Sequence, residues 1–164
     1  MTKGSVKMYN INIEQNFHFL SWDVIYWGIK NDLLMPKSAV DFAHKSAENA
    51  ESNGLCIELI ILDEVTKNNI LSLIDKFVIK EKSEKDALQI LKFIILKDIR
   101  KNADIDIILE EAEKVYADFD YPQDMKSFIR YMPVEDDFNL AEHSDMDCKK
   151  RLLKNLDVFL SKFM

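Results

Sequence analysis

The chain has 164 residues, of which 48% are hydrophobic and 31% charged, and its formal net charge is −7. This composition is typical of one globular domain with a hydrophobic core. No apolar run approaches the roughly 18 residues that a membrane-spanning helix requires, and Met1–Met8 contain no apolar signal core. We therefore expect a single cytoplasmic domain over residues 1–164, without membrane association.

Helical periodicity dominates the N-terminal part of the chain. Only residues 6–13 alternate as a strand would, and one such segment cannot form a sheet, so we expect an extended N-terminal arm. Ser21 is placed to cap a helix that ends near Asn31. Pro36 suits the first turn of a second helix, which Ser52–Gly54 stops.

The middle of the chain predicts two more helical regions. The first spans Leu55 to about Val78, with a break near Lys67–Asn69, where short polar side chains compete for helical hydrogen bonds. Ser83–Asp86 resembles a capping box that opens the second region. Its apolar residues recur on one face, which predicts a deeply buried helix: Leu88, Leu91, Ile95 and Ile99.

The C-terminal third predicts the remaining helices. Asp104 or Asp106 can cap a helix that runs to Tyr121, and a short helix follows from Pro122. An irregular acidic loop then leads to Ser144, which caps the last helix. The whole pattern predicts an all-α, single-domain bundle of about six to eight helices with an extended N-terminal arm.

Several individual side chains have predicted positions. Tyr116 and Phe119 lie three residues apart on one helix and are expected to pack inward. Trp22 is expected in the core. Arg130, which stands among acidic residues, is expected to form a structural ion pair that fixes the following loop.

The stretch Asp104–Asp147 is strongly acidic and also rich in aromatic residues. Its fourteen acidic and three basic residues give a net charge of −11, so the rest of the chain sums to +4. Such a surface suits a positively charged protein partner, whereas the phosphates of nucleic acid would be repelled. The competing interpretation is that the carboxylates are solvated helix faces and the aromatic residues form the core. Six aromatic residues are involved: Tyr116, Phe119, Tyr121, Phe128, Tyr131 and Phe138.

The chain contains no recognisable catalytic or metal-binding motif. Its three histidines match no metal-ligand spacing, and its three glycines lie too far apart to form a phosphate-binding loop. Cys56 and Cys148 match no metal site, and we expect two free thiols. Carboxylate pairs such as Asp118 with Asp120 are abundant, but an acidic chain supplies many by chance. We expect no metal, no cofactor and no catalytic residue.

Three segments resemble those of a bacterial family, domain of unknown function 2247: Phe17–Asp23 with Trp27 and Gly28, then Tyr116–Pro122, and Phe128–Pro133. The resemblance extends over nearly the whole chain, and the second and third segments are the specific ones. It implies a small cytoplasmic bacterial protein of a kind associated with toxin-immunity gene pairs in contact-dependent and polymorphic toxin systems. It implies no catalytic residues.

Charge and resemblance together favour a toxin-neutralising immunity protein that binds a cognate bacterial toxin. Because a nuclease cleft must be basic to hold phosphates, the expected partner is a nuclease domain, and the protein itself is not an enzyme and does not bind nucleic acid. The alternatives are a small cytoplasmic hydrolase that uses converging carboxylates, or a regulatory protein-binding adaptor. The expected partner-binding residues are Asp118, Asp120, Tyr121, Asp124, Glu135, Asp136, Asp137 and Phe138.

Overall fold

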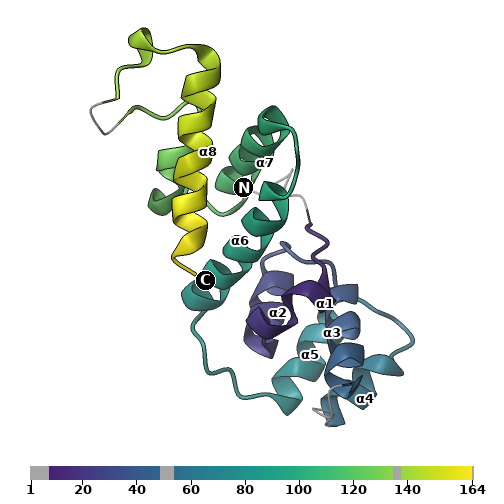
Figure 1. Ribbon diagram of the computed structural model, residues 1–164. Coiled ribbons are helices and arrows are strands. Elements are labelled where there is room, and N and C mark those ends of the chain that lie inside the picture. The colour runs from purple at the N-terminus through teal and green to yellow at the C-terminus, as the bar shows by residue number, and fades with distance from the viewer. Residues whose placement is uncertain (1–7, 49–53, 135–137, 164) are drawn as a thin grey trace. The chain divides into compact units, whose positions relative to one another are not determined.

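The computed structural model describes residues 8–48, 54–134 and 138–163 of the chain (Figure 1). Over these ranges the secondary structure is helical and contains no strand, which confirms the all-α prediction. None of the described helices has both the length and the apolar character that a membrane span requires. The single domain stays a prediction: the backbone contacts divide the chain within one helix into two compact units, Met1–Ile94 and Ile95–Met164.

The first unit consists of short helices that pack in pairs. Backbone contacts join α3 to α4, α4 to α5, α2 to α5 and α1 to α3. The elements are α1 (Ile13–Asn16), the 3-10 helix η1 (Phe17–Phe19), α2 (Trp22–Lys30), α3 (Lys37–Glu48), α4 (Gly54–Ile60), α5 (Lys67–Phe77) and the N-terminal part of α6 (Glu84–Arg100).

The predicted helix starts in this unit are confirmed, and one helix boundary is corrected. The Ser21 and Ser83 hydroxyls accept hydrogen bonds from the backbone N–H groups of Val24 and Asp86. The expected break between Leu55 and Val78 falls earlier than predicted, at residues 61–66. Thr66 caps α5, so the polar residues Lys67–Asn69 form its first turn rather than the interruption.

The N-terminal arm is described from Met8 onward. Tyr9 pairs with Leu34 in an isolated parallel bridge, whereas Ile13 already begins α1. Residues 1–7 of the expected arm lie outside the described residues. Trp22 is half-buried rather than a core residue, and its ring lies nearly perpendicular to that of Phe42 with centroids 4.7 Å apart. The side chains that α2 buries in the core are instead aliphatic ones, those of Val24, Ile25 and Ile29.

The second unit contains two long helices joined by irregular segments. Its elements are the end of α6, α7 (Ile105–Asp118), the 3-10 helices η2 (Gln123–Phe128) and η3 (Leu140–Glu142), and α8 (Asp145–Ser161). Asp104 caps α7 and Ser144 caps α8, as predicted. The short helix expected after Pro122 is present in the tighter 3-10 form. Both α7 and η2 contact α8, and the buried core includes Leu109, Val115, Met125, Phe128, Leu156 and Phe159.

Gly28 on α2 allows a close helix contact, and its replacement gives a stability test. A Cβ atom there would lie 2.6 Å from Leu34 Cδ1 and 3.0 Å from Leu91 Cδ2. Leu34 is only 1% exposed and has little room to move. Overpacking costs about 1–3 kcal/mol, and the higher helix propensity of alanine returns about 1. Because a Cβ atom 2.6 Å from a fixed side chain requires a shift, the overpacking cost should lie in the upper part of that range, at about 2–3 kcal/mol. We therefore expect Gly28→Ala to lower the free energy of unfolding by about 1–2 kcal/mol, measured by urea denaturation.

Gly54→Ala is the matched control for this prediction. Its added Cβ would approach Phe77 Cε1 at 3.0 Å, but Phe77 is 41% exposed and its ring can turn aside. The control should therefore change stability by less than about 0.5 kcal/mol. Equal stability of Gly28→Ala and the unmodified protein would show that the α2 contact is less tight than described.

Candidate protein-binding surface

The C-terminal end of α7 is closed by a Schellman motif, a hydrogen-bonded turn that ends many helices. Asp120 has φ 63°, in the left-handed region that favours glycine. Its N–H donates to the carbonyl oxygen of Ala117 at 3.2 Å, and the Tyr121 N–H donates to that of Tyr116 at 2.8 Å. Pro122 follows and cannot continue the helix. The motif therefore turns the chain sharply and fixes where Tyr121 stands.

Three tyrosines gather around this turn. The rings of Tyr121 and Tyr131 both contact Tyr116, with centroids 5.2 Å and 6.2 Å away. Tyr116 is 3% exposed, whereas Tyr121 and Tyr131 are 59% and 57% exposed. The Tyr116 hydroxyl donates to the sulfur of Met132 at 3.8 Å. The buried ring thus supports two exposed rings. We name this surface, formed by residues 116–124 and 130–132, the α7–η2 corner.

An ion pair holds the segment that carries Tyr131 against α7. Arg130 Nε donates to Glu113 Oε2 at 2.6 Å, and Arg130 Nη2 donates to Glu113 Oε1 at 3.0 Å. This two-pronged geometry is the strong form of an arginine–carboxylate contact, and its hydrogen bonds raise the pKa of Arg130. The structural ion pair predicted for Arg130 is confirmed. Because Tyr131 is the next residue, the pair also fixes its position.

The environment raises the pKa of the Tyr131 hydroxyl, which is a neutral phenol. Partial burial raises the pKa of this phenol, and the nearby Tyr116 and Glu113 raise it further. A neutral phenol can donate one hydrogen bond as well as accept one. The exposed Tyr131 therefore offers a partner both an aromatic face and a hydrogen-bond donor.

Four of the predicted partner-binding residues lie at this corner. Asp118 is the last residue of α7 and is half-buried, Asp120 and Tyr121 form the turn, and Asp124 is exposed in the first turn of η2. Phe119, expected to pack inward with Tyr116, is only half-buried because it is the C-cap residue where the helix ends.

Phe138, the other predicted aromatic anchor, lies elsewhere in the unit. Its ring stacks on His143 with centroids 4.2 Å apart, and the Arg151 guanidinium carbon lies 4.8 Å from the ring centroid. Residues 138–143 lie at the N-terminal end of α8, whereas η2 runs beside the middle of that helix (Figure 1). The predicted residues Glu135, Asp136 and Asp137 lie outside the described residues.

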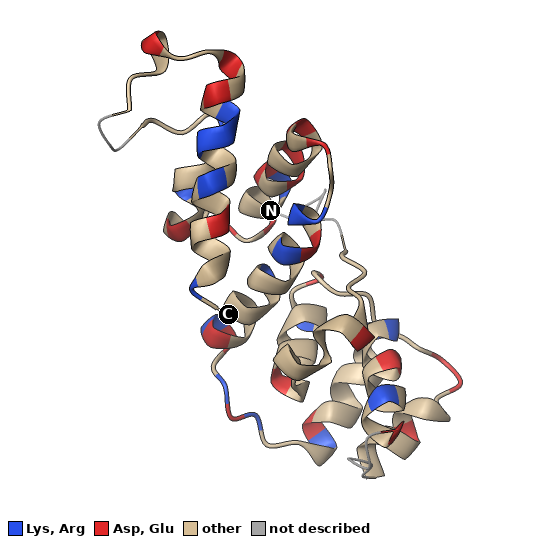
Figure 2. Ribbon diagram, in the orientation of Figure 1, with Lys and Arg blue, Asp and Glu red and all other residues tan. Residues whose placement is uncertain are grey.

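The acidic stretch is partly neutralised within the unit. Lys114 Nζ lies 3.2 Å from a Glu111 carboxylate oxygen, and Lys149 Nζ lies 2.7 Å from Asp106 and 3.0 Å from Asp145. Figure 2 shows basic residues along the N-terminal half of α8. Lys149 follows the acidic stretch in sequence but folds back onto it. The sequence window therefore overstates the negative charge that α7 presents.

The partner-binding residues predicted from the sequence include neither Tyr131 nor Glu113, whose ion pair with Arg130 supports this surface. Tyr131 stood in the recognisable segment Phe128–Pro133, which was the available signal. Glu113 gave no local signal, because its partner is seventeen residues away.

The histidines do not form a common site. The His18 ring contacts Phe19, His143 stacks on Phe138, and His44 is exposed on α3. Across the described ranges, no group of three or more histidine, cysteine or carboxylate side chains could hold a metal ion.

Comparison with known proteins gives a family and no relative of established role. No curated protein and no solved structure matches the chain. The family described as "Uncharacterized protein conserved in bacteria (DUF2247)" matches residues 11–163, and the chain belongs to this family.

Proposed function

We propose that this protein is a toxin-neutralising immunity protein that binds a cognate bacterial toxin through the α7–η2 corner. The observation that carries the proposal is the pair of exposed tyrosines, Tyr121 and Tyr131, held on the buried ring of Tyr116. Tyrosine is enriched among the few residues that dominate binding energy in protein interfaces. The protein acts by stoichiometric binding and catalyses no reaction.

The rigidity of the corner supports a role in binding. The Schellman motif fixes the backbone at Tyr121, and the Arg130–Glu113 pair fixes the backbone beside Tyr131. Rings that are already in place lose little conformational entropy when a partner covers them, so more of the contact energy becomes affinity. Two large aromatic rings that remain more than half exposed also have apolar surface left to bury.

The charge around the tyrosines favours a basic partner. Asp118, Asp120 and Asp124 lie within a few residues of Tyr121. Carboxylates at the rim of an interface speed the encounter with a positively charged protein. A nuclease domain is the partner class that fits, because its cleft must be basic to bind phosphates. The immunity role itself is what we infer from the resemblance to this family, and the charge argument supports it separately.

A regulatory adaptor would use the same surface for a different protein, whereas a hydrolase would need converging groups in a cleft. Coexpression with the product of the neighbouring gene separates these functions. An immunity protein restores growth of cells that make that toxin and forms a complex with it. If the purified proteins form no complex and growth is not restored, the immunity proposal is wrong.

The first binding prediction concerns the tyrosine rings. Tyr121→Ala and Tyr131→Ala should each weaken toxin binding by about 2 kcal/mol, or roughly thirtyfold in Kd, because each removes an aromatic anchor. Tyr121→Phe keeps the ring and should bind within about threefold of the unmodified protein. Val158→Ala, which shortens an exposed side chain on α8, should leave Kd unchanged. Calorimetry measures all four variants, and unchanged affinity in both alanine variants would exclude the corner.

The second prediction concerns the carboxylates. Asp120→Asn combined with Asp124→Asn should slow association with the toxin, and the unmodified pair should also associate more slowly as salt rises. The control Glu58→Gln with Glu64→Gln removes the same charge from exposed positions in the first unit. Stopped-flow measurements that give equal association rates for both double variants would show that the corner's charge has no steering role.

The third prediction separates stability from binding at one residue. Asp120 occupies a left-handed position, so Asp120→Gly should relieve backbone strain and raise the free energy of unfolding by about 0.5–1 kcal/mol. The same change should slow toxin association, because it removes a carboxylate. Asp120→Asn loses the charge but tolerates the conformation, so it should slow association with little change in stability. A loss of stability in Asp120→Gly would contradict the described turn.

A further inference from the structure

The helix α4 is apolar on both of its faces. Glu58 is the only charged residue from Leu55 to Ile61. Three side chains of one face are fully buried: Leu55, Cys56 and Leu59. On the opposite face, Ile57 and Ile61 are 57% and 65% exposed. A surface helix normally buries one apolar face and exposes a polar one, whereas a helix that is apolar all round is covered on both faces. The exposed face of α4 therefore indicates a second contact, beyond the one with its own core.

The exposed side chains of α4 form a continuous stripe with Phe77 of α5, the helix beside it (Figure 1). The Ile61 N–H donates to the Ile57 carbonyl oxygen at 3.1 Å, so Ile61 stands one helical turn beyond Ile57. Gly54 lies three residues before Ile57, on the same face. A Cβ atom at Gly54 would lie 3.0 Å from Phe77 Cε1, so the ring of Phe77 covers the first turn of this face. We name Ile57, Ile61 and Phe77 the α4 stripe.

The two ends of the α4 stripe carry opposite charges. At the Phe77 end, Lys76 Nζ lies 5.4 Å from the Phe77 ring centroid. The neighbouring carboxylate of Asp75 is paired with Lys80, so Lys76 makes this end basic. At the other end, two exposed carboxylates follow the stripe within three residues along the chain: Asp63 and Glu64. The stripe therefore has one basic end and one acidic end.

We propose that α4 pairs antiparallel with the α4 of a second copy of this chain, so that the two α4 stripes cover each other across a twofold axis. A contact of this symmetry requires a surface that is complementary to itself. Antiparallel pairing meets the requirement, because it brings the basic end of each stripe to the acidic end of the other. A uniformly basic protein would instead place like charge against Lys76. The contact uses the first unit alone and does not depend on the proposed immunity function.

The size and charge of the α4 stripe predict a weak dimer. Three partly exposed side chains per copy bury much less than the roughly 800 Å² per partner of a stable complex. Glu58 stands beside the middle of the stripe, where a twofold axis places it near its own copy, and this repulsion weakens the contact further. We therefore expect a Kd on the order of 10–100 μM.

The test is sedimentation equilibrium of the full chain over concentrations from about 5 μM to about 1 mM, which bracket the expected Kd. A reductant is present throughout, because the Cys148 thiol is only partly buried. The average mass should rise from that of one chain toward that of two. A chain that is still monomeric at the highest concentration overturns the proposal, and the stripe would then serve a different protein.

Ile57→Asp is the variant that tests the stripe itself. It places a carboxylate in the middle of the apolar contact and should raise Kd at least about tenfold. Val158→Asp makes a similar change on α8, where the side chain is 51% exposed, and should leave Kd unchanged. Circular dichroism should show that both variants keep the helical content of the unmodified protein, because both positions are exposed. A dimer that persists in folded Ile57→Asp lies elsewhere on the molecule and overturns the proposal.

Charge variants test the antiparallel arrangement and leave the apolar stripe intact. Lys76→Glu should raise Kd about fivefold, because it sets like charges against the acidic end of the second copy. Adding Glu64→Lys to the same chain should lower Kd again by about threefold, because opposite charges then face each other once more. A double variant that dimerises no better than Lys76→Glu shows that the ends do not meet, and the proposal fails.

Discussion

The helix stop at Asp120 is the constraint on which the second unit depends. Without the hydrogen bond from the Tyr121 N–H to the Tyr116 carbonyl oxygen, α7 would have no fixed end and Tyr121 would not stack on Tyr116. A glycine would occupy this backbone conformation at lower cost. The aspartate instead keeps a charge beside an exposed aromatic ring. The chain therefore keeps a strained backbone conformation at Asp120, where the proposed interface begins. Backbone strain is commonly retained at functional sites.

The parts of the fold that sequence reasoning predicted are those determined by neighbours along the chain. Three serines cap helices in the same way: Ser21, Ser83 and Ser144. Each hydroxyl accepts a hydrogen bond from the backbone N–H three residues later, so a short sequence segment contains the whole capping pattern. The start of α5 also depends on a local contact: Thr66 caps the helix, so the polar residues after it form the first turn rather than an interruption. Burial was harder to predict, because the coverage of Trp22 depends on distant segments and the position of Phe119 depends on where α7 ends.

Sequence reasoning predicted only some residues of the candidate surface. An ion-pair partner can lie far away along the chain, and the net charge of a sequence segment is not the charge of a surface. Tyr121 and the nearby aspartates lie close together along the chain, so a short sequence segment contains all of them. The sequence predicts an ion pair for Arg130 but not its partner, because Glu113 lies seventeen residues away along the chain. The net charge of the stretch Asp104–Asp147 also differs from the charge of the surface that this stretch forms. Lys149 neutralises Asp106 from beyond most of the acidic stretch, so counting residues alone exaggerates the field that α7 presents to a partner.

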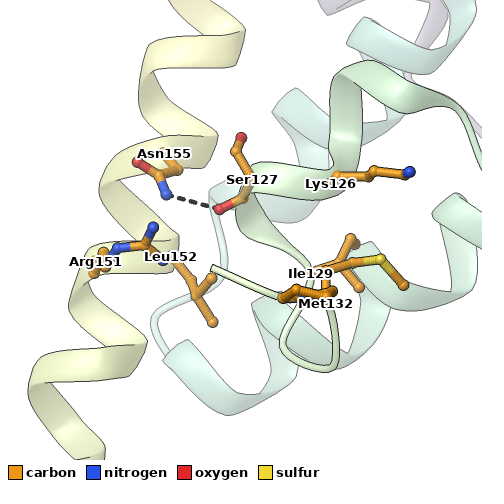
Figure 3. Close-up of a pocket in the computed structure, with 8 residues that line it drawn as sticks. Lys126, Ser127, Ile129, Met132, Arg151, Leu152 and Asn155 are labelled. Atoms are coloured by element: carbon orange, nitrogen blue, oxygen red, sulfur yellow. Dashed lines mark hydrogen bonds between the residues drawn. The ribbon is translucent and has the colours of Figure 1, made fainter. Parts of the chain in front are cut away.

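Residues 129–132 connect the α7–η2 corner with the buried part of the second unit. Tyr131 contacts Tyr116 at the corner, whereas Ile129 is buried and lines a pocket beside α8 (Figure 3). Met132 takes part in both, because its sulfur accepts the Tyr116 hydroxyl hydrogen bond while its side chain lines the same pocket. A displacement of Met132 must therefore alter the support of the buried tyrosine, and the ion pair of Arg130 with Glu113 resists that displacement.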